Sequence, residues 1–373
     1  MRRAIGLALL AAAFVSIYVG KASRRMPDFF VYWQVGARAA HAEPIYRVSD
    51  GEYQFKYFPE FAPLAIPIGA LPLRVAKVVW YAGLVAAFLA VLRLALRVLP
   101  ERRKPAALLV TILIVGLGKS YAEELVLGQI NLLLTLIVLC TILALARGRD
   151  ILAGLLIALA VVVKPYALIL TPWLLVRGRF RAIAAAIGGG VAAFLLLAAV
   201  YGPRAAVALH VAWWRTVRDT TVGTLMHPEN VSLAGMYGKW FGATPTAAWL
   251  TAATALALLL AAAIVMFARR GVAQPDGLEL GLLIALTPLL SPQGWDYVLV
   301  VFTPAVAYVV NYADALPRPV RWLTALGIAA VGLTLYDLLG RRLFYLLIMN
   351  SVTTLGALVI VGSLVLLRLR KAA

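Results

Sequence analysis

The chain has 373 residues, of which 63% are hydrophobic and 14% are charged, and its formal net charge is +19. A soluble domain of this length has too little polar surface to cover so many apolar side chains, so the composition excludes one and predicts an all-α polytopic membrane protein. The basic residues gather in short connections between apolar runs, as in membrane proteins, and this distribution argues against a nucleic-acid partner.

Apolar runs bounded by charges or turn residues predict about 12 transmembrane helices in a single integral membrane domain, residues 1–373. The runs lie at 4–20, 78–99, 106–118, 130–146, 151–163, 165–176, 182–201, 246–268, 278–290, 295–312, 320–336 and 343–367. Arg2 and Arg3 precede the first run, but no convincing small-residue cleavage site follows it. We therefore expect a retained helix rather than a signal peptide.

Dense basic clusters are expected to mark the cytoplasmic face. They are Arg102 to Lys104, Arg147 with Arg149, Arg177 with Arg179 and Arg181, Arg269 with Arg270, and Arg368 with Arg370 and Lys371. On this topology, the long polar connections 21–77 and 202–245 are the first and second extracytoplasmic loops. The sequence thus predicts a multi-pass protein of the cell inner membrane with its functional site on the extracytoplasmic side.

Two short apolar segments are unusual for a membrane-spanning chain. Residues 61–73 contain three prolines and are too short to cross a hydrocarbon core of about 30 Å as one helix, so we expect a re-entrant or interfacial segment. The runs 151–163 and 165–176 flank Lys164, and their outer ends are cytoplasmic by charge. Lys164 should therefore lie at an extracytoplasmic apex, where Pro165 favours a turn.

The first predicted loop opens with Asp28, followed by aromatic residues that include Tyr32 and Tyr57. A carboxylate beside aromatic rings at a membrane surface suits an enzyme that acts on a lipid-borne polar substrate. The structural alternative is that Asp28 caps an interfacial helix or pairs with Arg24 or Arg25.

Four further stretches place polar groups at predicted helix ends on the same side. Each has a structural alternative: Gln129, Asn131 and Ser232 could cap helices, Lys164 could snorkel to the surface, and Trp295 could be an interfacial anchor. The stretches are Lys119 to Glu124 with Gly128 to Asn131, Lys164 with Pro165, His227 to Ser232, and Ser291 to Tyr297.

The order of these motifs, Asp28 and Tyr32, then Gly128-Gln129-x-Asn131, Lys164-Pro165, Asn230-x-Ser232 and Ser291-Pro292-x-x-Trp295-Asp296, resembles that of the GT-C superfamily. Within it, the chain is similar to the polyprenol-phosphate-mannose-dependent mannosyltransferases of glycosyltransferase family 87. The resemblance covers roughly residues 26–305. One departure is that the family often carries histidine directly after the Trp-Asp pair, where this chain has Tyr297 and Val298.

The resemblance implies a GT-C-like bundle that transfers a sugar with inversion from a polyprenyl-phosphate donor to a glycolipid or glycan acceptor. It implies that Asp28 is the general base. Negative charge grows on the departing phosphate and needs a fixed cation, for which Lys164 and Lys119 are the candidates. We expect substrate contacts from Tyr32, Tyr57, Gln129, Asn131, Asn230, Ser232, Trp295 and Asp296.

Neither a cofactor nor a metal is expected, because His41, His210 and His227 are too scattered for a zinc motif. Cys140, the one cysteine, falls within an apolar run and excludes an internal disulfide. Membrane lipids are expected partners. The alternatives are a transporter or lipid flippase, which would carry ionisable residues within its helices, and a transferase that uses a polyprenyl-phosphate pentose.

Overall fold

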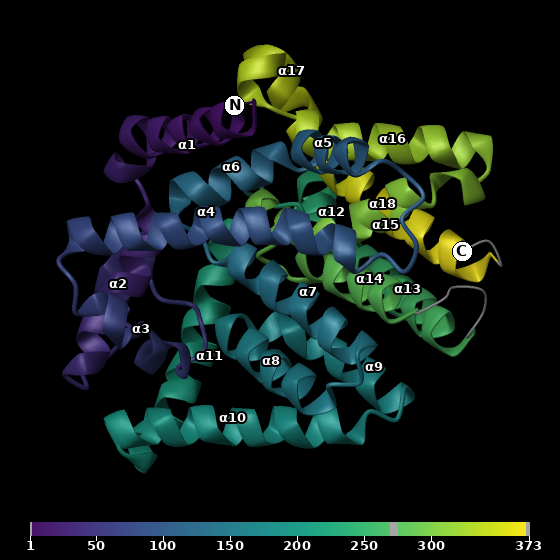
Figure 1. The fold of residues 1–373 in the computed structure, drawn as a ribbon. Coiled ribbons are helices and arrows are strands. Elements are labelled where there is room, and N and C mark those ends of the chain that lie inside the picture. The colour runs from purple at the N-terminus through teal and green to yellow at the C-terminus, as the bar shows by residue number, and fades with distance from the viewer. Residues whose placement is uncertain (1, 269–274, 371–373) are drawn as a thin grey trace.

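The computed structural model describes residues 2–268 and 275–370, and in these residues the regular structure is helical apart from one isolated antiparallel bridge between Asn230 and Trp295 (Figure 1). Of the basic clusters, Arg269, Arg270 and Lys371 lie outside the described residues. The prediction of an all-helical protein is therefore confirmed for the described residues.

The helices follow one another with short connections. The α-helices are α1 (Arg2–Gly20), α2 (Pro27–Ala40), α3 (Phe61–Gly69), α4 (Leu73–Arg97), α5 (Ala106–Gly116), α6 (Gly118–Leu127), α7 (Asn131–Ala146), α8 (Asp150–Val163), α9 (Thr171–Val176), α10 (Phe180–Tyr201), α11 (Pro203–Thr224), α12 (Leu233–Phe241), α13 (Pro245–Ala268), α14 (Pro275–Leu290), α15 (Thr303–Asn311), α16 (Arg318–Leu333), α17 (Tyr336–Met349) and α18 (Val352–Leu369). The 3₁₀ helices are η1 (Ala22–Arg24), η2 (Val48–Tyr53), η3 (Pro165–Leu170), η4 (Asp296–Phe302) and η5 (Ala313–Ala315).

Four of the described helices, α4, α10, α13 and α18, are long and apolar enough to cross a membrane. The bent pairs α5 with α6 and α16 with α17 raise this number to six if each pair forms one span. Shorter apolar helices of 10–17 residues account for several of the other expected spans. The predicted count of about 12 is therefore not confirmed, because several apolar runs fold as half-length or broken helices.

Many of the connections between helices lie at two opposite edges of the bundle (Figure 1). The edge toward the right of Figure 1 carries the basic connections 98–105, 147–149 and 177–179, and we name it the basic edge. The opposite edge carries α2, α3, the turn between α6 and α7 and the end of α8, and we name it the site edge. Charge and polar motifs are thus separated along the helices as the sequence predicts.

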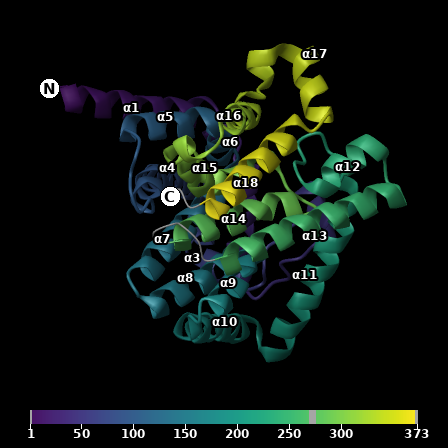
Figure 2. The same cartoon turned by 90° about the vertical axis from the view of Figure 1, so that its right-hand side faces the viewer.

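The centre of the bundle is formed by α7, α14 and α15, whose side chains are buried on most faces. Apart from Asp276 and Glu279 near the start of α14, their sequences are apolar on most faces, which is typical of helices surrounded by protein. By contrast, α10 and α13 leave most of their apolar side chains exposed at the periphery, while α1 and α17 extend from the bundle (Figure 2). These peripheral faces have the composition of a lipid-facing surface.

Small residues let neighbouring helices approach closely. A Cβ atom at Gly154 on α8 would lie 2.1 Å from the Ala182 carbonyl oxygen on α10, and one at Gly36 on α2 would lie 2.1 Å from the Ala65 carbonyl oxygen on α3. In the glycine run 188–190, only Gly189 meets the facing helix in this way, because a Cβ at Gly188 or Gly190 would enter open space.

The first long connection folds into helices rather than an open loop. Its short apolar segment forms α3, nine residues long, which packs against α2. Nine helical residues span about 14 Å, so α3 by itself cannot cross a bilayer. The assignment of α3 as re-entrant or interfacial stays a prediction. The second connection, 202–245, is mostly helical and contains α11 and α12.

Candidate active site

Asp28 lies in the first turn of α2, and the start of this helix is anchored to the end of α6. Met26 precedes the helix in a left-handed conformation with φ of 56°, and its backbone N–H donates to the Val126 carbonyl at 3.2 Å. Pro27 occupies the first helical position, where its fixed φ is favourable. No ion pair joins Asp28 to Arg24 or Arg25 among the described residues.

The turn between α6 and α7 is held against Asp28 by a glycine. Gly128 ends α6 with φ of +72°, and a Cβ atom there would lie 2.6 Å from the Phe29 Cβ. Only glycine combines this conformation with so close an approach. The next residue, Gln129, is thereby buried beside Asp28, and its Oε1 accepts hydrogen bonds from the Tyr32 and Tyr57 hydroxyls at 3.1 and 3.2 Å.

Behind this turn, Glu124 is completely buried and holds the start of α7. Its carboxylate accepts from the Asn131 side-chain amide at 2.5 Å and from the Leu132 backbone N–H at 2.9 Å. An acidic side chain is favoured at a helix N-terminus, where backbone N–H groups are unpaired. Glu124 therefore fixes Asn131, which sequence analysis assigned to substrate binding.

Burial raises the pKa of the Asp28 carboxyl from its ordinary value to about 6, and the Gln129 amide and the Lys164 and Lys56 ammonium groups act in the opposite direction. Desolvation disfavours the charged carboxylate, while hydrogen bonds and nearby cations favour it. A carboxyl group that titrates near neutral pH is suited to accepting a proton during a reaction.

Lys164 occupies the expected apex, in an extended conformation between α8 and η3, and its side chain is 9% exposed. Its ammonium lies 5.5 Å from the centre of the Tyr57 ring and 5.6 Å from that of Tyr166. Among the described residues it forms no ion pair or hydrogen bond through the side chain, although Glu124 and Asp28 attract it electrostatically. Lys164 is thus a buried cation that is not neutralised by direct contact.

Lys119 has a different environment, because its ammonium donates to Asp296 Oδ2 at 2.5 Å and lies 3.9 Å from Glu123 Oε1. Ser120 donates to the Asp296 backbone carbonyl at 2.8 Å. Lys119 and Ser120 therefore hold the side chain and the main chain of Asp296. The sequence placed Lys119 and Asp296 in separate motifs, and the fold joins them as an ion pair.

The motif containing Trp295 continues toward Asp28. The Trp295 ring stacks on Tyr297 with an angle of 11° between the ring planes, and its edge contacts His227 with the ring centres 4.9 Å apart. Tyr297 in turn interacts electrostatically with Asp28. Tyr297, at the position where the family often has histidine, is therefore within electrostatic range of Asp28.

Asn230 and Ser232 hold the framework of this part of the site. The Asn230 side-chain amide donates to the Pro292 carbonyl at 2.8 Å, and Ser232 caps α12 by accepting from the Gly235 N–H at 2.9 Å. Both residues are fully buried. The cap before Leu233, one of the alternatives from the sequence, is confirmed.

The structure therefore groups the predicted residues as three sets. One contains Asp28, Tyr32, Tyr57, Gln129, Asn131 and Lys164; the second contains Lys119, Trp295 and Asp296; and the third contains Asn230 and Ser232. Sequence reasoning missed Lys56 and Tyr166, which lie directly beside Tyr57 and Pro165, and proximity to those motifs was the available signal. In the part of the chain that the structure describes, no three His, Cys, Asp or Glu side chains gather as metal ligands.

A helical membrane protein with a partly buried acid and an unpaired cation at one edge has the groups needed to transfer a group between polar substrates. Residues 55–292 match glycosyltransferase family 87, which is more than half of the chain, and the protein belongs to this family of membrane glycosyltransferases. The family resemblance predicted from the motif order is thereby confirmed. No curated protein and no solved structure matches the chain.

Proposed function

We propose that this glycosyltransferase moves a sugar, most simply mannose, from a polyprenyl-phosphate carrier to a glycolipid or glycan hydroxyl at the extracytoplasmic face. The observation that carries the proposal is that one site holds the Asp28 carboxyl, whose pKa is raised to about 6, and the Lys164 ammonium, which has no ion pair or hydrogen bond among the described residues. One group can accept a proton while the other stabilises negative charge.

The reaction requires a base on the acceptor side. Asp28 takes the proton of the acceptor hydroxyl, the hydroxyl oxygen forms a bond to the anomeric carbon, and the bond from that carbon to the phosphate oxygen breaks. The electron pair of the broken bond stays on the polyprenyl phosphate, and the single displacement inverts the anomeric configuration. Gln129, fixed by the Tyr32 and Tyr57 hydroxyls, orients the Asp28 carboxylate.

Lys164 is the better of the two candidate cations for the departing phosphate. Lys119 would have to leave Asp296 before it could contact a phosphate, whereas Lys164 has no such partner among the residues that the structure describes. A positioned charge that needs no rearrangement stabilises the transition state more effectively. We therefore assign Lys164 to the phosphate and Lys119 to holding the Asp296 motif.

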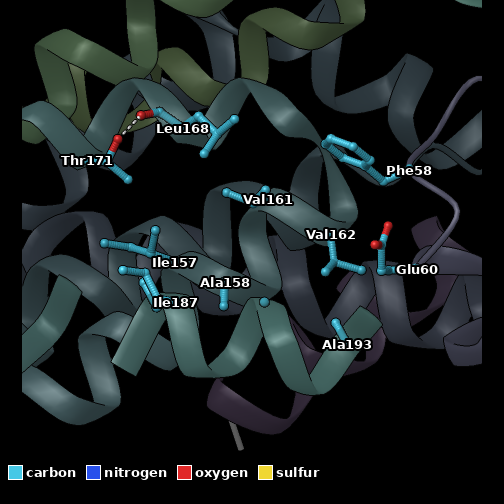
Figure 3. A pocket seen from close by; sticks show the side chains of 12 residues that line it. Phe58, Glu60, Ile157, Ala158, Val161, Val162, Leu168, Thr171, Ile187 and Ala193 are labelled. Atoms are coloured by element: carbon cyan, nitrogen blue, oxygen red, sulfur yellow. Dashed lines mark hydrogen bonds between the residues drawn. The ribbon is translucent and has the colours of Figure 1, made fainter. Parts of the chain in front are cut away.

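An apolar groove next to Lys164 supports a lipid-linked donor. It lies between α8 and α10 and has a cavity volume of about 270 Å³. Figure 3 shows Val161 and Val162 on its wall, with Phe58 and Glu60 at one end. Val162 precedes Lys164 by two residues, and Phe58 follows Tyr57, whose ring faces the ammonium. A carrier phosphate at Lys164 would place the first isoprenoid units in this groove.

The test is transfer by the purified protein from radiolabelled polyprenyl-phosphate mannose, with products separated into lipid, glycan and protein fractions. Asp28→Asn is the matched inactive control, and its rate should fall by at least about 100-fold, the scale of lost general-base catalysis. A parallel reaction with polyprenyl-phosphate arabinose separates hexose from pentose transfer. Labelled donor that crosses proteoliposome membranes without losing its sugar would instead identify a flippase.

A further inference from the structure

A second apolar groove, far from Asp28, lies among α5, α15 and α16 and has a cavity volume of about 440 Å³. One face of α16 forms a wall along most of its length, since Arg321, Thr324, Ala325, Ile328 and Ala329 follow the i, i+3, i+4, i+7, i+8 pattern of one helix face. The facing walls come from α5 and from the end of α15 with the segment that follows it.

The groove closes toward the site edge. A Cβ atom at Gly332 on α16 would lie 2.3 Å from the Val115 carbonyl oxygen on α5, and one at Gly116 would lie 2.4 Å from the Ile328 Cγ2. The two helices therefore touch at this end. Toward the basic edge small side chains, Ala313 and Ala325, line the groove and leave its space unfilled.

Arg321 lies at the end of the groove near the basic edge, and main-chain groups hold its guanidinium in place. Nε donates to the Leu316 carbonyl at 2.7 Å and Nη2 donates to the Asp314 carbonyl at 2.8 Å. Among the described residues, the partner of Nη1 is the Asp314 carboxylate, with Oδ1 at 3.7 Å, and that carboxylate also accepts from Lys104. Nη1 is therefore held in place and can donate hydrogen bonds to a ligand.

The surroundings of Arg321 are cationic overall. Segments 101–104 and 314–321 contain five basic and two acidic residues; the acids are Glu101, which pairs with Arg103, and Asp314. An apolar groove that ends at a fixed guanidinium within a basic surface is complementary to a phospholipid, with its acyl chain in the groove and its phosphate at the guanidinium.

We propose that this groove binds one anionic phospholipid of the adjacent leaflet, with an acyl chain between α5 and α16 and its phosphate on Arg321. The inference does not depend on the donor or the acceptor of the transfer reaction. Because lipid tails are as apolar as the groove, tail burial gives little preference between lipids. The headgroup therefore determines which lipid binds, because a guanidinium forms paired hydrogen bonds to phosphate and the basic surface favours a lipid with a net negative charge.

Native mass spectrometry of the delipidated full-length protein tests the proposal, with phosphatidylglycerol and phosphatidylcholine as probes. We expect one phosphatidylglycerol per chain, bound about tenfold more tightly than phosphatidylcholine. Arg321→Gln should weaken phosphatidylglycerol binding at least about fivefold and Arg321→Lys less, because an ammonium keeps the charge but not the fork. Arg318→Gln is the matched control, since Arg318 is exposed on the same segment and does not line the groove.

Two phenylalanine substitutions test whether an acyl chain occupies the groove. This test remains available if an Arg321 variant does not fold. Ala325→Phe should reduce binding, whereas Leu326→Phe, on an exposed position beside it, should not. Equal losses from Arg321→Gln and Arg318→Gln would mean a general cationic surface and overturn the proposal. Equal affinity for the two lipids, or displacement by glycerol 3-phosphate alone, would overturn it as well.

Discussion

At the scale of residues, the candidate site depends on an acid and a cation that are not paired with each other. Asp28 and Lys164 attract each other electrostatically, but Gln129 contacts the acid and aromatic rings surround the ammonium. A direct ion pair would lower the pKa of the acid and neutralise the cation. Their separation leaves the acid able to accept a proton and the cation able to stabilise a phosphate, as the proposed mechanism requires.

The raised pKa of Asp28 predicts the pH dependence of transfer. Below about pH 6 the carboxyl is protonated and cannot accept the acceptor proton, so kcat/KM should rise with pH through an apparent pKa of about 6. Initial rates of the purified enzyme between about pH 5 and 8 check this, with residual activity of Asp28→Asn expected to lack the inflection. A flat wild-type profile would exclude Asp28 as the titrating base.

Replacing Lys164 should affect turnover more than assembly. In Lys164→Met the departing phosphate loses a fixed charge, so kcat should fall by roughly 100-fold, while Lys164→Arg recovers part of it. The measurement is kcat and donor KM at saturating acceptor, with the thermal melting temperature as a control for folding. A Lys164→Met enzyme with wild-type constants would show that the lysine only snorkels.

At the scale of elements, broken helices bring the polar groups together. The apex between α8 and η3 presents Lys164, and the left-handed end of α6 at Gly128 presents Gln129. Backbone groups at such breaks need partners inside a membrane protein, and buried side chains such as Glu124 supply them. The same breaks explain why only four to six spans among the described residues reach the length of a complete membrane crossing.

The groove between α8 and α10 offers a prediction at this scale. A Cβ atom at either Gly188 or Gly190 would meet open space, but only Gly190 lines the groove. Gly190→Leu should therefore raise the donor KM by roughly tenfold, equivalent to about 1.4 kcal/mol, with little effect on stability. Gly188→Leu is the matched control. Equal donor KM values for the two variants would show that the groove does not bind the donor.

At the scale of the whole molecule, the two edges carry different chemistry. The basic connections gather at one edge, and Asp28, Gln129 and Lys164 gather at the other. The positive-inside rule therefore predicts that the site edge faces the outside of the cytoplasm. Sugars outside the cytoplasm are not normally supplied as nucleotide donors, which is why a lipid-linked donor fits the proposed side.

Impermeant labelling tests this orientation. Glu52 is exposed in η2 at the site edge, and Cys140 is the only native cysteine. In a Cys140→Ala background, Glu52→Cys should react with an impermeant maleimide in cells whose inner membrane is intact. Reaction only after inner-membrane lysis would reverse the topology, and with it the argument for the donor.

The sequence by itself determined the helical membrane class, the polarity of the two edges, the family and the apex at Lys164. Composition, charge position and motif order are local properties, so they can be read without knowing which helices touch. Only the tertiary structure decided that Lys119 is paired with Asp296, that Glu124 holds Asn131, and that Tyr166 faces Lys164. These contacts join segments that are distant in the sequence, through helix breaks and close approaches at glycines. The direction of the chain after a break depends on how the helices pack, and a local sequence pattern does not specify that packing.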